Sequence, residues 1–395
     1  MAKLIEITGK ALSGEWGKDD ETGNGVPVLR TTNFTNEGII DYNSVVTRTI
    51  TKKNIGEKFL RKGDIIIEKS GGSDKFPVGR VVYFDGDDNT YLFNNFTGLL
   101  RVKEPKMWYP RYVFYSLFAN YKRGGTRMFE NKTTGLHNLK TDDYVSRYEV
   151  TEIDMIEQVS VCDKLDKLYE IINERKQQLE LLDELVKARF VEMFGEPLEG
   201  TAKYPIHQVG EIANLVDPQP SHRTPPIDED GIPYVSIKDC DYKTGKINFE
   251  SARKVSRKVL EEHLNRYTLH DGDFVIGKIG TIGNPVFVPA SDDYTLSANV
   301  ILVQPNSELV SPYFLKFSFE SDYIKRQFIE AKNSTSQAAF GIQKVRMINV
   351  MNPDLSVQRE FEAFAKQIDK SKVAIKKSLD ETQILFDSLM QKYFG

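Results

Sequence analysis

Side chains that could bind phosphate groups recur in two parts of the 395-residue chain. From Arg101 to Lys132 there are eight basic residues against two acidic ones, with tyrosines between them that could support such a surface. Polar loops adjoin the basic runs, and Ser, Thr, Asn, Gln, Lys and Arg are the side chains that read base edges. We therefore predict a nucleic-acid-binding surface with these contact residues: Ser70, Gly71, Ser73, Lys75, Lys122, Arg123, Arg127, Lys132 and Thr133 in the first half, and Lys254, Arg257, Lys278, Thr281, Lys332, Asn333, Ser334 and Gln337 in the second.

Simpler explanations of the same residues stay open. An isolated basic run, such as residues 253–258, is more often solvated surface than a set of nucleic-acid contacts. Turn formation alone would explain the glycines of these loops equally well.

Motifs that would indicate catalysis are missing from the sequence. It has no G-x-x-x-x-G-K-[ST] phosphate loop and no G-x-G-x-x-G after a predicted strand, which argues against an ATPase or a dinucleotide enzyme. Neither Asn-Pro pair, at 284–285 and 352–353, belongs to the Asn-Pro-Pro-aromatic loop with which amino-methyltransferases hold a flipped base. His263 and His270 lie near acidic residues, but their spacing matches no metal-binding motif. We expect no catalytic residue, no metal site and no cofactor bound by this chain.

Charge and cysteine content narrow the class of protein. The net charge is -4, but residues 151–200 hold 6 Lys and Arg against 13 Asp and Glu, whereas residues 1–150 hold 23 against 19. The acidity is therefore concentrated in one segment. Two cysteines, Cys162 and Cys240, exclude a disulfide framework. No run of 18 apolar residues and no signal-peptide core occurs, so we expect a cytoplasmic protein.

The end of the sequence resembles its middle at a displacement of 200 residues, without gaps. Two looser matches precede these tails: LRKGDIIIEKSGG at 60–72 with LHDGDFVIGKIGT at 269–281, and VPVLRTTNF at 26–34 with IPYVSIKDC at 232–240. This predicts the order globular domain, tail, globular domain, tail. The matched tail positions include Asp154 with Asp354, Gln158 with Gln358, and Phe194-Gly195 with Phe394-Gly395.

Both tails predict long helices, each roughly 60 Å in length at 1.5 Å per residue. Apolar residues recur in them at spacings of three and four, which is typical of a coiled-coil seam. One helix packing on its own domain would explain either stripe, but two matched stripes favour antiparallel pairing with each other. The predicted seam residues are Leu165, Leu168, Ile172, Leu179, Leu182 and Val186 in the first tail, and Ile368, Ile375, Leu379 and Leu385 in the second.

The globular regions contain short β-rich runs that follow Gly-Asp turns, with some helix between them. We predict an α+β fold of two mixed, β-rich domains separated by two long antiparallel helices that form a coiled coil, with a pseudo-twofold internal repeat. The predicted boundaries are 1–150 for the first domain, 151–196 for the first helix, 197–351 for the second domain and 352–395 for the second helix.

Taken together, these features resemble the specificity (S) subunit of type I restriction-modification systems over essentially the full chain. The motifs that carry the resemblance are KGDIIIEK at 62–69, DGDFVIGK at 271–278, IGTIG at 279–283, LDELVKARFVEMFG at 182–195 and LFDSLMQKYFG at 385–395. The resemblance implies two target recognition domains, each reading one half of an asymmetric bipartite site in double-stranded DNA. Base-reading residues vary within that family, so the contact residues predicted above rest on residue type and loop position alone.

The resemblance also implies partners. Two methyltransferase (modification) subunits would join the chain to methylate DNA, and restriction/translocase subunits would join in a complex that also cleaves it. S-adenosylmethionine, ATP and Mg would be bound by those partner subunits. Three other functions remain open: the specificity subunit of a related methyltransferase-nuclease without a motor, a self-contained DNA methyltransferase or nuclease, and a coiled-coil scaffold that binds only protein.

Overall fold

The computed structural model describes residues 1–395 except 134–135, 197–201, 222, 243, 279–282 and 334–340, and except the side chains of 132–133, 136 and 332–333. Its internal contacts divide the chain into two compact units. Unit 1 comprises Met1–Lys176 with Lys377–Gly395, and unit 2 comprises Gln177–Lys376. Both units mix helix and sheet, which confirms the mixed class predicted from the sequence.

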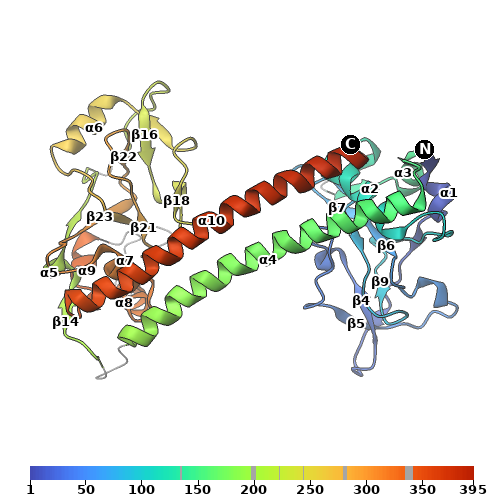
Figure 1. Cartoon of the computed structure of the whole chain (residues 1–395), viewed down its shortest axis with the longest axis horizontal. Coiled ribbons are helices and arrows are strands. Elements are labelled where there is room, and N and C mark those ends of the chain that lie inside the picture. The colour runs from blue at the N-terminus through green and yellow to red at the C-terminus, as the bar shows by residue number, and fades with distance from the viewer. Residues whose placement is uncertain (134–135, 197–201, 222, 243, 279–282, 334–340) are drawn as a thin grey trace. The chain divides into compact units, whose positions relative to one another are not determined.

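Unit 1 is built around a four-stranded antiparallel sheet of order β2-β10-β6-β8. Strand β6 is buried along its whole length because apolar cores cover both of its faces: Ile65 and Ile67 face one core and Ile66 the other. Helix α2 packs beside β8. Figure 1 labels this helix and the central strand β6. The bounds are β2 Leu12–Ser13, β6 Ile65–Glu68, β8 Val81–Tyr83, β10 Thr97–Leu100 and α2 Pro110–Lys122.

Three smaller sheets complete unit 1, with orders β3-β5-β4-β9, β11-β12-β7 and β1-β13. Their strands are β1 Ala2–Lys3, β3 Lys18–Asp19, β4 Val26–Leu29, β5 Val46–Thr49, β7 Ser70–Gly72, β9 Leu92–Phe93, β11 Glu130–Thr133, β12 Leu136–Leu139 and β13 Glu149–Val150. Two short helices, α1 at Leu4–Thr8 and α3 at Thr141–Arg147, pack near the β1-β13 pair.

Unit 2 has a corresponding central sheet of order β15-β23-β20-β21, again antiparallel. Its other sheets are β19-β16-β22, β14-β24 and β17-β18. The strands are β14 Ile206–Gln208, β15 Ala213–Val216, β16 Ile232–Val235, β17 Cys240–Asp241, β18 Lys246–Ile247, β19 Arg253–Val255, β20 Phe274–Gly277, β21 Val286–Phe287, β22 Thr295–Leu296, β23 Val300–Pro305 and β24 Asn349–Met351. The helices are α5 Val209–Ile212, α6 Arg257–Leu264, α7 Pro312–Glu320, α8 Asp322–Asn333 and α9 Ile342–Arg346.

Strand pairing corresponds between the units beyond the central sheet. β4 pairs antiparallel with β5 and parallel with β9, and β16 pairs antiparallel with β19 and parallel with β22. The turns that lead into β6 and β20 each contain a glycine in the left-handed region, Gly63 at φ 99° and Gly272 at φ 92°. A Cβ at Gly272 would come within 2.7 Å of Pro312 at the start of α7, so this turn requires glycine.

The predicted tails are two helices, α4 at Met155–Phe194 and α10 at Leu355–Phe394. In unit 1, Leu165 and Ile172 of α4 share a core with Phe386, Met390 and Phe394 of α10. Because both sets are buried, this end of the helix pair is held by apolar packing within unit 1.

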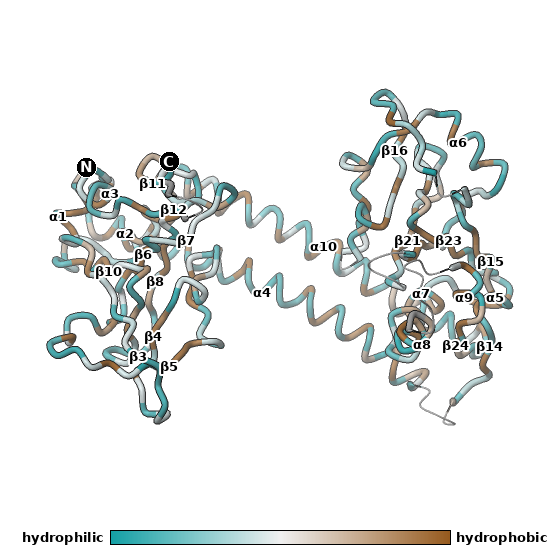
Figure 2. The backbone as a smooth tube through the Cα atoms, turned by 180° about the vertical axis from the view of Figure 1, so that it is seen from behind, coloured by the Kyte–Doolittle hydropathy of each residue, from teal (hydrophilic) through white to brown (hydrophobic). Residues whose placement is uncertain are grey.

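In unit 2 the later part of α4 packs with the earlier part of α10, where Val186 and Phe190 share a core with Phe361. Two ion pairs join the helices, Asp183 with Lys372 and Arg189 with Glu360. From the first pair to the second, the α4 residue moves forward in the sequence and the α10 residue moves backward. The two helices are therefore antiparallel within this unit. Hydrophobic and hydrophilic residues alternate along both helices in Figure 2.

The predicted seam residues differ in burial. Val186 is buried, as are Leu165 and Ile172, while Leu385 is 50% exposed and its neighbour Phe386 takes the buried position. The remaining seam residues are partly buried: Leu168, Leu179, Leu182, Ile368, Ile375 and Leu379. Among the described residues, no helix is both long enough and apolar enough to cross a membrane.

Candidate nucleic-acid interface

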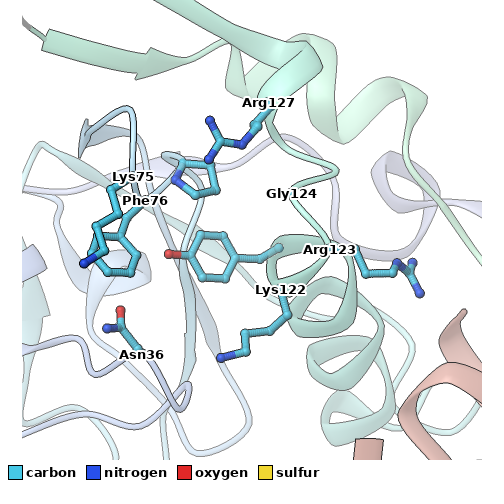
Figure 3. Close-up of a pocket in the computed structure, with 9 residues that line it drawn as sticks. Asn36, Lys75, Phe76, Lys122, Arg123, Gly124 and Arg127 are labelled. Atoms are coloured by element: carbon cyan, nitrogen blue, oxygen red, sulfur yellow. The ribbon is translucent and has the colours of Figure 1, made fainter. Parts of the chain in front are cut away.

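A pocket of about 400 Å³ on unit 1 brings together four of the predicted contact residues, Lys75, Lys122, Arg123 and Arg127 (Figure 3). We call it the basic pocket. Its other lining residues are Asn36, Phe76, Pro77, Tyr121 and Gly124. Three separate segments of the chain therefore meet here, and only the fold brings them together.

The end of α2 shapes one wall of the basic pocket. The helix stops at Lys122, and Gly124, at φ 74°, turns the chain back. Arg127 lies in the next helical turn and donates from Nη2 to the carbonyl of Asp74 at 3.2 Å. That bond ties this wall to the loop that carries Lys75.

The basic pocket has an excess of positive charge. No ion pair among the described residues involves Lys75 or Lys122, and both side chains are exposed. Tyr121 is 6% exposed, and burial raises the pKa of its phenol, so the hydroxyl stays protonated and can donate a hydrogen bond. Phe76 is 48% exposed beside these cations. Cations attract phosphates and an exposed ring offers a stacking surface for a base, so the pocket suits a nucleic-acid strand.

Arg123 differs from the other three basic residues. Its side chain points away from Lys75 and Lys122 in Figure 3, and it donates from Nη1 to the carbonyl of Phe394 at 2.5 Å. The ring of Phe394 also lies 5.1 Å from that of Tyr112. Arg123 therefore attaches the last turn of α10 to α2 within unit 1.

The other first-half candidates lie in nearby strands and turns. Ser70 lines a second pocket, and the Ser73 hydroxyl accepts from the amide of Phe76 at 3.1 Å. Gly71 has φ 134°, where a Cβ would come 2.9 Å from the Glu68 carboxylate. Lys132 and Thr133 pair through their backbones with β12, and their side chains lie outside the described residues.

The described second-half candidates have different surroundings in unit 2. Lys254 donates from Nζ to the carbonyl of Glu229 at 3.1 Å, and Arg257 is exposed at the start of α6. Lys278 is only 3% exposed, and its ammonium donates to Asp217 at 2.6 Å, so this side chain lies inside unit 2. Thr281, Ser334 and Gln337 lie outside the described residues, as do the side chains of Lys332 and Asn333 at the end of α8.

His263 is a buried structural residue of unit 2. Its Nδ1 lies 2.6 Å from the Thr295 hydroxyl and its Nε2 lies 2.7 Å from Gln219 Oε1. An amide oxygen can only accept, so Nε2 donates to Gln219, and in the neutral ring Nδ1 accepts from the Thr295 hydroxyl. Burial lowers the pKa of His263 to about 4. The ring therefore holds Gln219, and with it the loop that follows Asp217.

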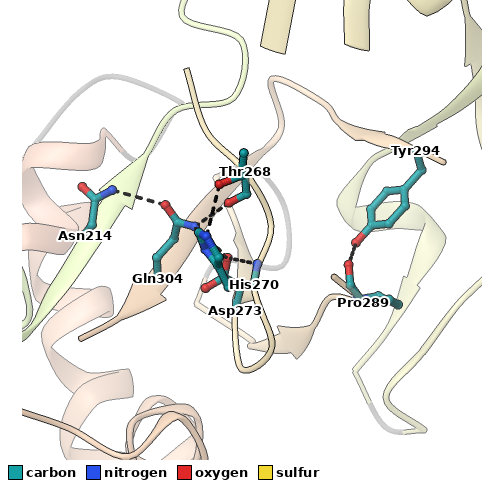
Figure 4. Close-up of polar contacts among 7 residues, drawn as sticks. All are labelled: Asn214, Thr268, His270, Asp273, Pro289, Tyr294 and Gln304. Atoms are coloured by element: carbon teal, nitrogen blue, oxygen red, sulfur yellow. Dashed lines mark hydrogen bonds and ion pairs between the residues drawn. The ribbon is translucent and has the colours of Figure 1, made fainter. Parts of the chain in front are cut away.

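His270 belongs to a different cluster, drawn in Figure 4. Asp273 accepts from the His270 amide at 2.9 Å and from Gln304 Nε2 at 2.7 Å. Asp273 directly precedes β20, and the corresponding residue of unit 1 is Asp64, which directly precedes β6. The Asp64 carboxylate accepts two hydrogen bonds from Arg101, at 2.6 and 2.7 Å. Both clusters fix the turn that leads into the central strand, β20 in one unit and β6 in the other.

Among the lining side chains that could hydrogen-bond or stack with a nucleic acid, sequence reasoning missed Asn36 and Phe76. Asn36 lies more than 80 residues before the end of α2, and no spacing rule connects such distant positions. Phe76 follows Lys75 directly, and an exposed aromatic residue beside a loop lysine was the signal that could have identified it.

Comparison with known proteins finds one family similarity and several structural ones. Residues 208–383 match the family described as Type I restriction modification DNA specificity domain. The chain is similar to the S subunit of the type I restriction-modification system from M. genitalium, with 15% identity and a TM-score of 0.58, over 100% of this chain and 95% of that one. No curated protein matches the sequence.

The fold is also similar to a structure described as "Structural basis underlying complex assembly and conformational transition of the type I R-M system". That similarity has 14% identity and a TM-score of 0.54, over 100% of this chain and 96% of the other. These solved structures share the fold of this chain, and the family match confirms the resemblance predicted from the sequence for residues 208–383.

Proposed function

From the match of residues 208–383 to the family of type I restriction modification DNA specificity domains, we infer that the chain is the DNA specificity subunit of a type I restriction-modification enzyme. Its role is to recognise DNA sequence, and partner subunits carry out the chemistry. The family match is the observation that carries this inference, and the basic pocket of unit 1 supports it with a surface suited to a nucleic-acid strand.

Each unit would read one half of a bipartite site. The corresponding strand orders of the two units support an internal duplication, in which two similar domains meet two similar stretches of duplex. The candidate contact residues differ between the units, so the two half-sites should have different sequences. The recognised site is then asymmetric rather than palindromic.

The long helices would set the distance between the half-sites. Helices α4 and α10 each have 40 residues, which corresponds to roughly 60 Å. Two half-sites that lie on the same face of the duplex, one helical turn apart, have centres about 34–36 Å from each other. We propose that α4 and α10 form an antiparallel coiled coil along their whole length, related by a pseudo-twofold axis, and that this pair defines the spacer.

Two modification subunits would bind S-adenosylmethionine and transfer its methyl group at the site that this chain selects. Restriction/translocase subunits with ATP and Mg would add cleavage in a complete restriction complex. Because its DNA substrate is there, the chain would act in the cytoplasm.

Reconstitution tests this function. The chain and its modification subunits are mixed with a library of DNA duplexes and S-adenosylmethionine, and methylated duplexes are sequenced. We expect methylation at one bipartite sequence, and we expect none when the chain is left out of the mixture. Binding that ignores sequence in excess nonspecific DNA would contradict the function, and methyl transfer by the chain alone would favour a self-contained enzyme.

A further inference from the structure

Lys69 of unit 1 and Lys278 of unit 2 occupy corresponding positions, each directly after the central strand of its sheet. Lys278 Nζ lies 2.6 Å from the carboxylate of Asp217, whereas Lys69 Nζ lies 2.9 Å from the hydroxyl of Ser13. Ser13 ends β2 and Asp217 directly follows β15, and these strands occupy the same edge of the two sheets. Unit 2 therefore supplies an anion to its lysine at a position where unit 1 has a neutral hydroxyl.

The register of the strands supports this correspondence. Leu12 pairs with Leu99 on β10, and Val216 pairs with Leu302 on β23. Leu99 and Leu302 in turn pair with Ile66 and with Val275, the second residues of β6 and β20. The residues that follow Leu12 and Val216 are Ser13 and Asp217.

Lys69 lines a pocket of about 420 Å³, which we call the Lys69 pocket. Among the described residues Lys69 has no carboxylate within ion-pair distance. A Cβ at Gly98 would come within 3.4 Å of Lys69 Cδ, so the glycine leaves room for the lysine stem. The other lining residues are Ala11, Ser13, Ser70, Asn95, Phe96, Asn138, Leu139, Thr141 and Asp142.

The charges around Lys69 favour a bound anion. Burial lowers the pKa of Lys69, the positive charge of Lys58 lowers it further, and the carboxylate of Asp142 opposes them. Asp142 is exposed to solvent, which weakens its effect. The half-buried ammonium of Lys69 donates to a hydroxyl, which carries no negative charge to balance it. An anion in the pocket would balance this charge.

We propose that the Lys69 pocket binds a phosphate group, which takes the place that the Asp217 carboxylate occupies in unit 2. This proposal rests on the function proposed above, because the phosphate then belongs to the backbone of the bound DNA. The amide groups of Asn95 and Asn138 line the same pocket, and Phe96, 53% exposed, offers a ring on which an adjoining base can stack.

The internal comparison supplies the test variant, Ser13→Asp, which recreates the arrangement of unit 2 and fills the site with a carboxylate from the chain itself. Lys69→Gln removes the cation instead, and Lys106→Gln is the control, because Lys106 is exposed and lines neither pocket. The first readout is carbon-13 NMR of the reductively methylated chain during titration with inorganic phosphate. We expect phosphate to shift the Lys69 signal in the unaltered chain and in Lys106→Gln, but not in Ser13→Asp.

The second readout is DNA binding by the complex with modification subunits, measured at several salt concentrations. One phosphate contact contributes about 0.9 to the slope of log K against log salt. We expect Ser13→Asp and Lys69→Gln each to lower the slope by about that amount while the recognised sequence stays the same.

The two readouts separate the outcomes. A Lys69 signal that still responds to phosphate in Ser13→Asp, or fails to respond in the unaltered chain, would overturn the proposal. Ser13→Asp could lose the phosphate response while the slope of log K against log salt stays unchanged. That result would show that the pocket binds free phosphate and would contradict binding of a DNA phosphate. Sequence-independent DNA binding by the unaltered complex would defeat the proposed function, while the NMR titration would still report on the pocket.

Discussion

Gln158 and Gln358, which are 200 positions apart, make the same two kinds of hydrogen bond. Gln158 accepts from the Tyr109 amide at 2.8 Å and donates to the Ile153 carbonyl at 2.9 Å. Gln358 accepts from the Ser311 amide at 2.7 Å and donates to the Pro353 carbonyl at 2.6 Å. Tyr109 and Ser311 cap α2 and α7 at their N-termini, so each glutamine joins the start of a long helix to the start of a shorter helix that precedes it in the chain.

Replacing Gln358 by Leu should destabilise unit 2. The substitution leaves a buried backbone amide and a buried carbonyl without partners, and each such loss costs about 1–3 kcal/mol. We expect the free energy of unfolding in urea to fall by at least about 2 kcal/mol. Gln367→Leu is the matched control, because Gln367 is exposed on the same helix. Equal stability of the two variants would contradict the role given to Gln358.

Much of the fold could be predicted from the sequence because its signals were local. The absence of Pro and Gly from 154–194 and the Gly that follows predicted the helix that the structure has at Met155–Phe194. The Gly-Asp turns predicted β6 and β20, because a left-handed glycine followed by an aspartate leads into each of these strands. Strands of two or three residues, such as β2 and β7, carry too little periodicity to be recognised.

The candidate site was predicted only in part, because a lysine looks the same in the sequence whether it is exposed or buried. Lys75 and Lys122 do line one pocket, but Lys278 is buried against Asp217, a residue 61 positions earlier. Arg123 contacts the carbonyl of Phe394, 271 positions later. Such long-range pairings depend on the packing of whole domains, which local patterns do not specify.

Removing the positive charges of the basic pocket should weaken DNA binding and its salt dependence together. In the triple variant Lys75→Ala, Lys122→Ala and Arg127→Ala, the slope of log K against log salt should fall by about 0.9 for each side chain that binds a phosphate. The measurement is equilibrium binding of the complex with modification subunits at several salt concentrations. Lys106→Ala, outside the pocket, should keep the original slope. An unchanged slope in the triple variant would indicate that DNA binds to other loops and not to the basic pocket.

A charged residue on α10 should lower the free energy of unfolding only where the side chain that it replaces is buried. Leu379 packs partly buried against the core of unit 1, so Leu379→Asp buries a carboxylate without a cation and should lower the free energy of unfolding by about 2 kcal/mol or more. Leu385 lies on the same helix but is 50% exposed, so Leu385→Asp should cost less than about 0.5 kcal/mol. Chemical denaturation measures both, and the reverse order would show that the buried face of α10 is misassigned.

Acid should destabilise unit 2 through His263. Its pKa is about 4 in the folded chain, against 6.5 for an ordinary histidine, so the unfolded chain binds more protons between these values. The neutral ring therefore contributes stability that is complete above pH 6.5 and is lost as the pH falls toward 4. The effect is on the order of 3 kcal/mol.

Denaturation of His263→Gln from pH 7 to pH 4 checks this effect. The variant should lose less stability over this range than the unaltered chain does. His270→Gln is the control, because the His270 side chain is 67% exposed and should leave the pH dependence in place. Parallel pH profiles for His263→Gln and the unaltered chain would show that His263 does not titrate as described.

The most direct test of sequence reading by this chain is an exchange of units. A hybrid carries residues 1–176 and 377–395 of this chain and the corresponding second unit of a specificity subunit with a known site. It is combined with modification subunits, and the methylated bases of a genome are sequenced. We predict that one half of the recognised site stays that of this chain, while the other half becomes that of the donor. Methylation that keeps both original half-sites, or that no longer depends on sequence, would contradict recognition of one half-site by each unit.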